Sequence, residues 1–354
     1  MMKDYIDKNV IEKRRIYYTT ILSEIISKDG QYLIAGCKSG KLVKFNLGDI
    51  LIGNQLANSF ESEDELADSQ KNINLKKKPT QIVETQLPIY SLEWFQSSNS
   101  IPYCLVGSKG LIQVYSFENN DLQFKSSITL PRHDIMVNSL LSVDNYLYAG
   151  CGDNNIYLID FSAQKIVKTL SGHKDYINDL TVAKDGTLFS ASEDGSVGIW
   201  DTRNNQIVQQ IQPYKHETIS RPSNGKWIGA IEVDDKKDWL ICGGGPMLSL
   251  WHLRSLSPST KFQVSTNNWT PNVSQFHGDY IIAGGNLPNI FVWEINGNLL
   301  SQIHTSPSNV YSISSLLIEN EDIGTNQVIS AAGTSYKIDI CTNWKYKDFE
   351  LVIA

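Results

Sequence analysis

Hydrophobic and polar residues alternate along the chain in short runs that recur seven times. Each recurrence contains an apolar run that ends in a cluster of small residues. These runs occupy 32–37, 103–108, 146–151, 187–192, 239–244, 280–285 and 327–333. After each run come a polar or glycine-containing turn and a second run with strict alternation. The second runs occupy 41–47, 111–117, 155–161, 196–202, 248–254, 289–295 and 336–342.

A third run precedes each small-residue cluster. These runs occupy 21–27, 89–95, 137–143, 177–183, 228–234, 272–278 and 310–316. In all three sets, the period of two and the enrichment in β-branched residues predict β-strands. The intervening segments show no helical periodicity of useful length, so the sequence predicts an all-β protein.

The spacing of the repeats predicts how the strands assemble. The bulky residue that closes the second run falls at Phe45, Tyr115, Ile159, Trp200, Trp251, Trp293 and Ile340. Successive positions are 41 to 51 residues apart, except for a first interval of 70 that contains the polar segment 48–80. A period of roughly 40–45 residues is that of WD-repeat blades. Seven copies predict a seven-bladed WD40 β-propeller, a closed ring that protects its strand edges.

The fourth repeat resembles the WD repeat most fully, with Gly172-His173 and Trp200-Asp201 at the expected places. In that family a His, a Ser or Thr, a turn Asp and a Trp form a buried hydrogen-bonded chain. The resemblance assigns these positions to His173, Ser190, Asp194 and Trp200. A Ser, a His and an Asp also make up hydrolase triads, but the resemblance favours a structural role here.

The repeats define the domain organisation. Residues 21–354 are predicted to form the propeller, and 1–20 an N-terminal arm. The segment 48–80, between the first and second blades, is rich in Asn, Ser and acidic residues, so we expect it to be disordered. Residues 349–353 are predicted to supply the outer strand of the last blade, and 14–20 are the alternative.

Composition narrows the class of protein. A net charge of −7 and a pI near 5.4 argue against a general grip on nucleic acid, which needs a concentrated basic field. The start of the sequence lacks the apolar core of a signal peptide, and no apolar run approaches transmembrane length. The five cysteines form no close pairs, as is typical of a reducing compartment. We therefore expect a soluble intracellular protein without membrane contact.

No motif indicates a cofactor or catalysis. The six His and five Cys lack metal-ligand spacing. The run 35–41 differs from a phosphate-binding loop in its spacing and leads into a strand rather than a helix. A propeller hydrolase needs acidic or His residues that converge at the central channel, and the inner strands supply them only at unmatched positions. Those residues are Glu24, Glu93, Asp179, Glu232, Asp234 and His277.

The connection that leads into the fifth repeat, residues 212–227, is about ten residues longer than the corresponding stretch in the neighbouring repeats. The candidates for a charged surface presented to a partner are four residues of this connection: Lys215, His216, Glu217 and Arg221. The glycine turn Gly243, Gly244, Gly245 and Pro246 is predicted to belong to the same surface. The alternative is structural: Arg221 and Asn224 brace the loop and Trp227 anchors it.

The same repeat resembles one WD-repeat family, subunit 6 of the THO complex, which takes part in coupling transcription to mRNA export. The strings RPSNGKWIG (221–229) and CGGGP (242–246), followed by LWHLR (250–254), carry the resemblance. It implies a nuclear, non-enzymatic scaffold subunit that binds the helical parts of other THO subunits and meets mRNA only indirectly. Replacing Lys215, His216 and Arg221 with Ala is expected to leave the fold intact and weaken that binding.

A second hypothesis comes from Trp200-Asp201-Thr202-Arg203. This run resembles the Trp-Asp-x-Arg box through which some propellers dock on the adaptor of cullin-type ubiquitin ligases as substrate receptors. Asp201 and Arg203 would then contact the adaptor. The alternative is that both residues only stabilise the turn at the end of the strand.

Overall fold

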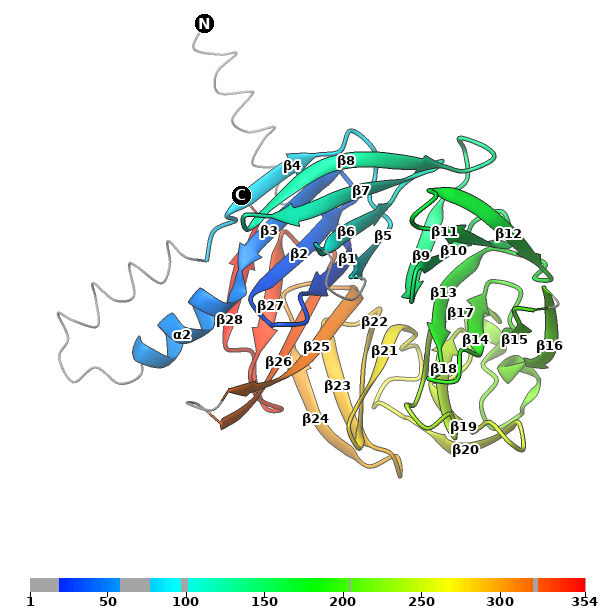
Figure 1. Cartoon of the computed structure of the whole chain (residues 1–354). Coiled ribbons are helices and arrows are strands. Elements are labelled where there is room, and N and C mark those ends of the chain that lie inside the picture. Colours follow the sequence, from blue (N-terminus) through cyan, green and yellow to red (C-terminus); the bar gives the residue numbers. More distant parts are fainter. Residues whose placement is uncertain (1–18, 58–76, 97–100, 204, 321–323, 354) are drawn as a thin grey trace, which may run out of the picture.

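The computed structural model describes residues 19–57, 77–96, 101–203, 205–320 and 324–353. Strands in this part of the chain form seven four-stranded antiparallel sheets, each built from consecutive strands. Figure 1 shows the sheets arranged as blades around a central channel, with the innermost strand of each blade beside it. The prediction of an all-β, seven-bladed WD40 β-propeller is confirmed.

The strands of each blade follow one another from the channel to the rim. Blade 1 contains β1 (Ile21–Ile26), β2 (Tyr32–Cys37), β3 (Lys41–Asn46) and β4 (Gln81–Glu84), and blade 2 contains β5 (Ser91–Phe95), β6 (Tyr103–Gly107), β7 (Leu111–Glu118) and β8 (Asp121–Thr129). Blade 3 contains β9 (Val137–Val143), β10 (Tyr146–Cys151), β11 (Asn155–Asp160) and β12 (Lys165–Ser171), and blade 4 contains β13 (Ile177–Val182), β14 (Leu188–Ser192), β15 (Val197–Asp201) and β16 (Gln206–Ile211). Blade 5 contains β17 (Ile228–Val233), β18 (Trp239–Gly244), β19 (Ser249–His252) and β20 (Ser257–Lys261), and blade 6 contains β21 (Pro271–His277), β22 (Tyr280–Gly285), β23 (Asn289–Glu294) and β24 (Leu299–His304). Blade 7 contains β25 (Val310–Asn320), β26 (Gly324–Gly333), β27 (Lys337–Cys341) and β28 (Phe349–Val352).

The repeat period reflects a core position that every blade shares. The bulky residue that closes the third strand is buried in all seven blades. At this position Trp251, Trp293 and Phe45 are fully enclosed, and Trp200 is only 2% exposed. Burial of one large side chain per blade at the same place supplies much of the apolar area that holds the sheets.

Inner-strand side chains also link each blade to the next through the main chain. At six junctions a side-chain oxygen accepts a main-chain N–H of the following blade, and at the seventh Gln275 donates to a carbonyl. The pairs are Ser23 Oγ–Leu92 N (3.0 Å), Glu93 Oε1–Ser142 N (3.0 Å), Ser139 Oγ–Leu180 N (3.2 Å), Asp179–Ile231 N, Glu232 Oε2–Phe276 N, Gln275 Nε2–Ile313 O (2.8 Å) and Ser312 Oγ–Glu24 N (3.0 Å). These bonds run in one direction around the channel, and the last of them closes the ring between blades 7 and 1.

The outer strand of blade 7 comes from the C-terminal part of the chain. β28 pairs with β27, and Phe349 lies opposite Ile340. This arrangement confirms 349–353 as the source of the closing strand rather than the alternative 14–20. Most of that alternative, and of the predicted arm 1–20, lies outside the described residues.

The segment 48–80 is where the structure corrects the sequence prediction. It connects β3 to β4 within blade 1, so its predicted place between the first and second blades is wrong. Its beginning forms the helix α2 (Leu47–Ala57), so the expectation of disorder is wrong for these residues. Asn46 caps the helix by accepting the Asp49 N–H at 3.2 Å, while Asp49 accepts the Asn46 amide at 2.8 Å. Leu47 and Ile50 are fully buried against residues of blades 1 and 7, which stabilises the helix. Residues 58–76 lie outside the described part of the chain.

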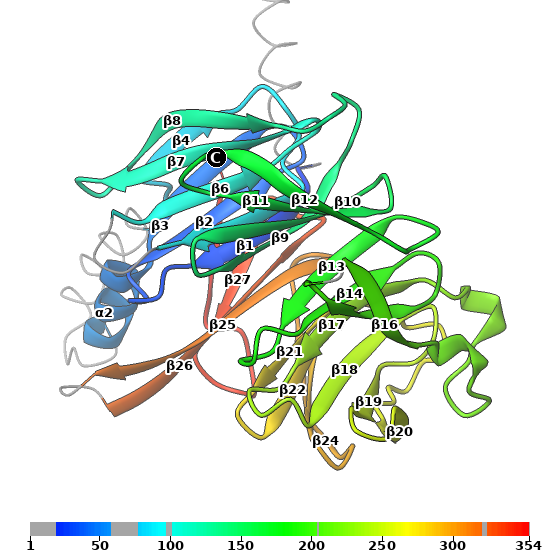
Figure 2. The same ribbon diagram turned by 45° about the vertical axis from the view of Figure 1, so that its right-hand side comes forward.

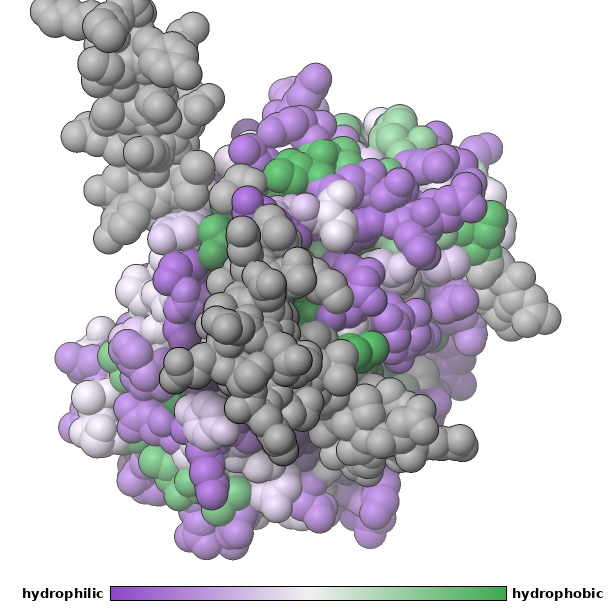
Figure 3. Space-filling model, turned by 90° about the vertical axis from the view of Figure 1, so that its left-hand side faces the viewer, coloured by the Kyte–Doolittle hydropathy of each residue, from purple (hydrophilic) through white to green (hydrophobic). Residues whose placement is uncertain are grey.

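Two features extend beyond the ring. In Figures 1 and 2, α2 and the far end of the β25–β26 hairpin project on the same side of the molecule. Figure 3 views that side, where the visible described residues form a largely hydrophilic surface with separate small apolar spots. The exposed large apolar side chains are correspondingly scattered over several blades rather than gathered on one.

Candidate functional site

The structure brings together the four residues that the WD-repeat resemblance assigns in blade 4. Trp200 Nε1 donates to Ser190 Oγ at 2.8 Å, and Ser190 Oγ lies 2.6 Å from His173 Nε2. His173 Nδ1 lies 2.9 Å from Asp194 Oδ2. Because the Asp194 carboxylate only accepts, His173 Nδ1 carries the proton and its Nε2 accepts the Ser190 hydroxyl. These hydrogen bonds join the loop before β13, the strands β14 and β15 and the turn between those two strands.

The Asp194 carboxylate is the charged end of this chain. Its burial raises its pKa, but hydrogen bonds from His173, Ser196 and the Lys174 N–H outweigh that effect. The pKa of Asp194 is therefore held well below its usual range. The ionised form of this residue stabilises the folded state.

The geometry argues against hydrolysis at these residues, although a Ser–His–Asp order is present. The Ser190 side chain is fully buried, and the Trp200 indole already donates to one lone pair of its oxygen. A nucleophile must instead reach a substrate carbonyl with its lone pair free. The tetrad therefore holds the blade together.

Blade 5 replaces this chain with a shorter one. Trp251 Nε1 donates to Ser249 Oγ at 2.9 Å. The His216 ring packs edge-on against Trp251 with centroids 4.9 Å apart, much as His173 meets Trp200 at 5.9 Å. His216 thus packs against the core of the blade and stays only partly accessible.

Arg221 is bound by the main chain on several sides. Its guanidinium donates to five carbonyl oxygens, which belong to the glycine turn and to the connection between blades 5 and 6. They are the carbonyls of Gly244 (3.0 Å), Gly245 (3.0 Å), Pro246 (2.9 Å), Asn267 (3.3 Å) and Trp269. Half-burial lowers the pKa of Arg221, but an arginine stays charged. We call this arrangement, formed by Arg221 with the segments 243–246 and 267–269, the arginine lock.

The glycines of the turn make the lock possible. A Cβ on Gly244 would lie 2.3 Å from the Trp227 carbonyl oxygen, and one on Gly245 would lie 2.4 Å from that of Gly225. Side chains at these positions would push the loop away from the blade. Trp227 anchors the same loop by donating to the Asn224 carbonyl at 3.2 Å.

These contacts correct the predicted partner surface. Gly243, Gly244, Gly245 and Pro246 are all buried, and His216 and Arg221 are only partly accessible. The bracing alternative describes Arg221 and Trp227. Among the predicted residues Lys215 and Glu217 are exposed, as is Lys226 of the same connection. The connection itself contains two short 3₁₀ turns, η1 (Pro213–Lys215) and η2 (Pro222–Asn224).

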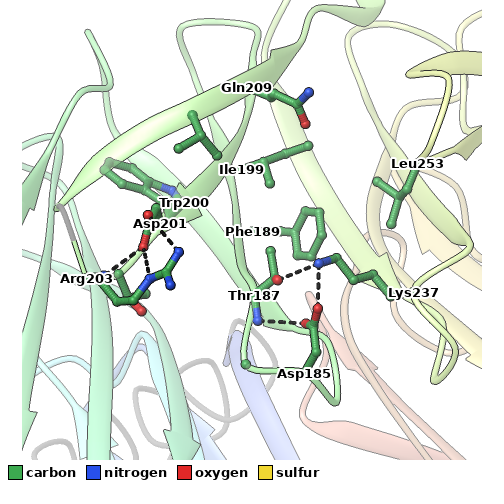
Figure 4. Close-up of a pocket in the computed structure, with 13 residues that line it drawn as sticks. Asp185, Thr187, Phe189, Ile199, Trp200, Asp201, Arg203, Gln209, Lys237 and Leu253 are labelled. Atoms are coloured by element: carbon green, nitrogen blue, oxygen red, sulfur yellow. Dashed lines mark hydrogen bonds and ion pairs between the residues drawn. The ribbon is translucent and has the colours of Figure 1, made fainter.

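The second candidate surface lies between blades 4 and 5, and Figure 4 shows it in close-up. Here a groove of about 600 Å³ has Phe189 and Ile199 at its centre. Arg203, with 87% of its side chain exposed, lies on one side and forms a bidentate pair with Asp201 at 2.9 and 3.2 Å. On the other side Lys237 donates to Asp185 at 2.6 Å, which links the turns of the two blades.

The described residues contain no group of three or more His, Cys, Asp or Glu side chains arranged to hold a metal ion. Within the same part of the chain, no helix is both long and apolar enough to cross a membrane.

The ring of blades, the shared core position and the blade-4 tetrad define the molecule as a WD-repeat β-propeller. Accordingly, the family described as WD domain, G-beta repeat matches residues 164–201. Similarity to particular proteins extends much further. THO complex subunit 6 homolog of Danio rerio is 31% identical over 348 residues, which cover 95% of this chain and 98% of the relative. THO complex subunit 6 of Homo sapiens is 30% identical over 349 residues, covering 94% and 93%.

The corresponding Drosophila melanogaster protein is 29% identical over 335 residues, covering 94% of this chain and 89% of the relative. The similarity therefore spans the whole propeller and is not confined to the generic repeat. The chain belongs to the THO complex subunit 6 family.

Proposed function

We propose that the chain is a non-catalytic scaffold subunit of a THO-type complex in the nucleus, where it couples transcription to mRNA processing and export. The observation that carries the proposal is the end-to-end similarity to proteins named as subunit 6 of the THO complex. In this role the propeller holds other THO subunits through their helical, coiled-coil parts and meets mRNA only through them. The net charge of −7 is consistent with that indirect contact.

The physics of the fold suits a scaffold. Every blade junction is closed by hydrogen bonds from inner-strand side chains, so the docking surfaces keep fixed relative positions. A rigid binder loses little conformational entropy when a partner docks. Rigidity therefore favours assembly without requiring a very large contact area.

The arginine lock suggests where one partner docks. By tying the connection 212–227 to the blade, the lock presents Lys215, Glu217 and Lys226 from a fixed backbone. The exposed cations Lys215 and Lys226 on this connection are complementary to a row of acidic side chains on a partner helix. In this proposal the buried arginine lock fixes the backbone of the connection, and the exposed side chains on that backbone contact the partner.

A tagged chain recovered from nuclear extract tests the proposal. The wild-type protein is expected to bring down other THO subunits, identified by mass spectrometry. Lys215→Glu combined with Lys226→Glu is expected to weaken that recovery, because the charge reversal opposes an acidic partner surface. Lys38→Glu combined with Lys165→Glu is the matched control, since both residues are exposed on other blades.

The outcomes separate two levels of the proposal. Absence of THO subunits from the wild-type recovery contradicts the scaffold role itself. Wild-type recovery by the Lys215/Lys226 variant contradicts only the docking surface.

A second function, docking on a cullin-ligase adaptor, is favoured by the exposure of Arg203 beside the groove. If it holds, Arg203→Ala abolishes recovery of the adaptor. Arg254→Ala is the matched control, because Arg254 is exposed at the same position of the Trp-x-x-Arg run in blade 5. Equal recovery with both variants, or none with the wild type, rules this function out.

A further inference from the structure

The central channel contains a polar cavity of about 390 Å³ lined by all seven inner strands. Three of its carboxylates come from three different blades: Glu93 on β5, Asp179 on β13 and Glu232 on β17. Among the described residues that line this cavity there is no Lys, Arg or His. Glu93, Asp179 and Glu232 do not occupy equivalent positions in their repeats, but closure of the ring brings all three to one channel.

The polar groups of the cavity are dominated by acceptors. Asn138, Asn178 and Asn272 each donate a side-chain N–H to the first residue of the next inner strand, at 2.8, 2.9 and 3.1 Å. Each of these amides thus has at least one of its two N–H donors engaged within the protein. Ser274, only 4% exposed, has a hydroxyl oxygen without a hydrogen-bond partner among the described residues, and so does the amide oxygen Oε1 of Gln275.

A carboxylate accepts several hydrogen bonds, and those of the channel are only partly used by the protein. Glu93 Oε1 accepts the Ser142 N–H at 3.0 Å, Asp179 Oδ1 accepts the Ser139 hydroxyl at 3.1 Å, and Glu232 Oε2 accepts a main-chain N–H. Each side chain remains partly open to the channel. The site thus offers negative charge and spare acceptors but lacks a cation.

We propose that the channel is a binding site for an alkylammonium group, carried either by a free polyamine or by a lysine side chain of a partner. An ammonium supplies three N–H donors and no acceptor, which complements the carboxylates, Ser274 and Gln275. The inference does not depend on the assembly role proposed above.

Electrostatics couples this binding to proton release. Burial raises the pKa of Glu93 and Asp179 to about 7 and that of Glu232 to about 8. Lys28 opposes the shift at Glu93, while Asp179 and Asp235 add to it at Glu232. A bound ammonium favours the ionised carboxylates, so it lowers these pKa values and displaces protons near neutral pH.

Isothermal titration of the full chain with spermidine, at about pH 7.5 in two buffers of different ionisation enthalpy, tests the inference. Saturable binding with a buffer-dependent enthalpy is expected. Asp179→Asn combined with Glu232→Gln is expected to weaken it at least about tenfold, because two charges are lost while the amides keep the acceptor oxygens. Thermal unfolding of the variant verifies that the ring is intact.

Glu84→Gln combined with Glu118→Gln is the matched control: it makes the same charge change on the rim and is expected to leave binding unchanged. A second titration uses a short lysine-containing peptide. Tighter spermidine binding identifies a free polyamine as the ligand, and tighter peptide binding identifies a partner's lysine. Saturable binding of neither amine at millimolar concentration, or wild-type binding by the channel variant, overturns the inference.

Discussion

Replacement of Arg221 by Ala measures what the arginine lock contributes. The change removes the guanidinium donor from the carbonyls of Gly244 and Gly245 in a buried turn, whereas the Pro246 carbonyl keeps the Gly244 N–H at 3.2 Å. An orphaned buried polar group costs about 1–3 kcal/mol, so we expect these two carbonyls to cost about 3 kcal/mol together. The carbonyls of Asn267 and Trp269 lie beside solvent-exposed residues, so water replaces part of their bonds to Arg221 and they add little to the expected loss.

The expected shift of the melting temperature follows from the size of the chain. An unfolding entropy of about 2.1 cal/mol/K per residue gives about 0.7 kcal/mol/K for 354 residues. A loss of about 3 kcal/mol therefore lowers the midpoint by about 4 °C if the propeller unfolds as one unit. Differential scanning calorimetry measures that shift, and hydrogen exchange shows whether protection falls first in 243–247 and 267–270.

Two controls make the result specific to the lock. Arg221→Lys keeps the charge but not the planar fork, so it is expected to fall between Ala and the wild type. Lys226→Ala removes an exposed cation from the same connection and is expected to change the midpoint little. A shift of less than about 1 °C for Arg221→Ala, with unchanged exchange in both segments, refutes the reasoning.

Trp200→Ala, which empties the core position of blade 4, is expected to lower the free energy of unfolding by about 3–5 kcal/mol in denaturant titration, and a loss below about 1 kcal/mol contradicts its assigned role. Because the pKa of Asp194 is lowered in the folded state, its ionised form adds stability above the unfolded pKa of about 3.9, and this contribution disappears as the pH falls through the folded value. Asp194→Asn is expected to reduce the loss of stability in acid, as measured by circular dichroism. The pH dependence from Glu232 has the opposite sign, because burial raises its folded pKa to about 8 and stability therefore falls as the pH rises from about 4.3 to 8. Glu232→Gln is expected to flatten that slope, and an unchanged slope contradicts the raised pKa. Gly244→Ala, whose new methyl group meets the Trp227 carbonyl oxygen at 2.3 Å, is expected to lower the melting temperature measured by calorimetry, and a wild-type value contradicts the close approach.

The residues whose role depends on long-range contacts were the ones for which sequence reasoning left two alternatives or chose the wrong one. The acceptors of Arg221 are carbonyl oxygens 23 to 48 residues away, and every residue type carries such an oxygen, so no pattern of letters reveals them. The same reasoning treated Gly243–Pro246 as surface, although the turn is buried. The signal available in advance was the triple glycine itself, which indicates close approach of main chains.

The helix α2 was missed for a related reason. Its local signals are weak: Asn46 and Asp49 form a cap, but Gly48 and Gly53 interrupt a short apolar stretch. Its stability comes from Leu47 and Ile50, which are buried against strands from the first and last blades. Those strands are separated by almost the whole chain and become neighbours only when the ring closes.

The seven repeats, the strand order within each blade, the blade-4 tetrad and the family all follow from the amino-acid sequence. These depend on period-two alternation and on contacts within one repeat, where residues close in sequence are also close in space. Only the tertiary structure decided which conspicuous residues face solvent, where α2 packs and that Glu93, Asp179 and Glu232 share one channel. Such relations arise between blades, and the position of one blade relative to another is set by closure of the ring rather than by any local pattern.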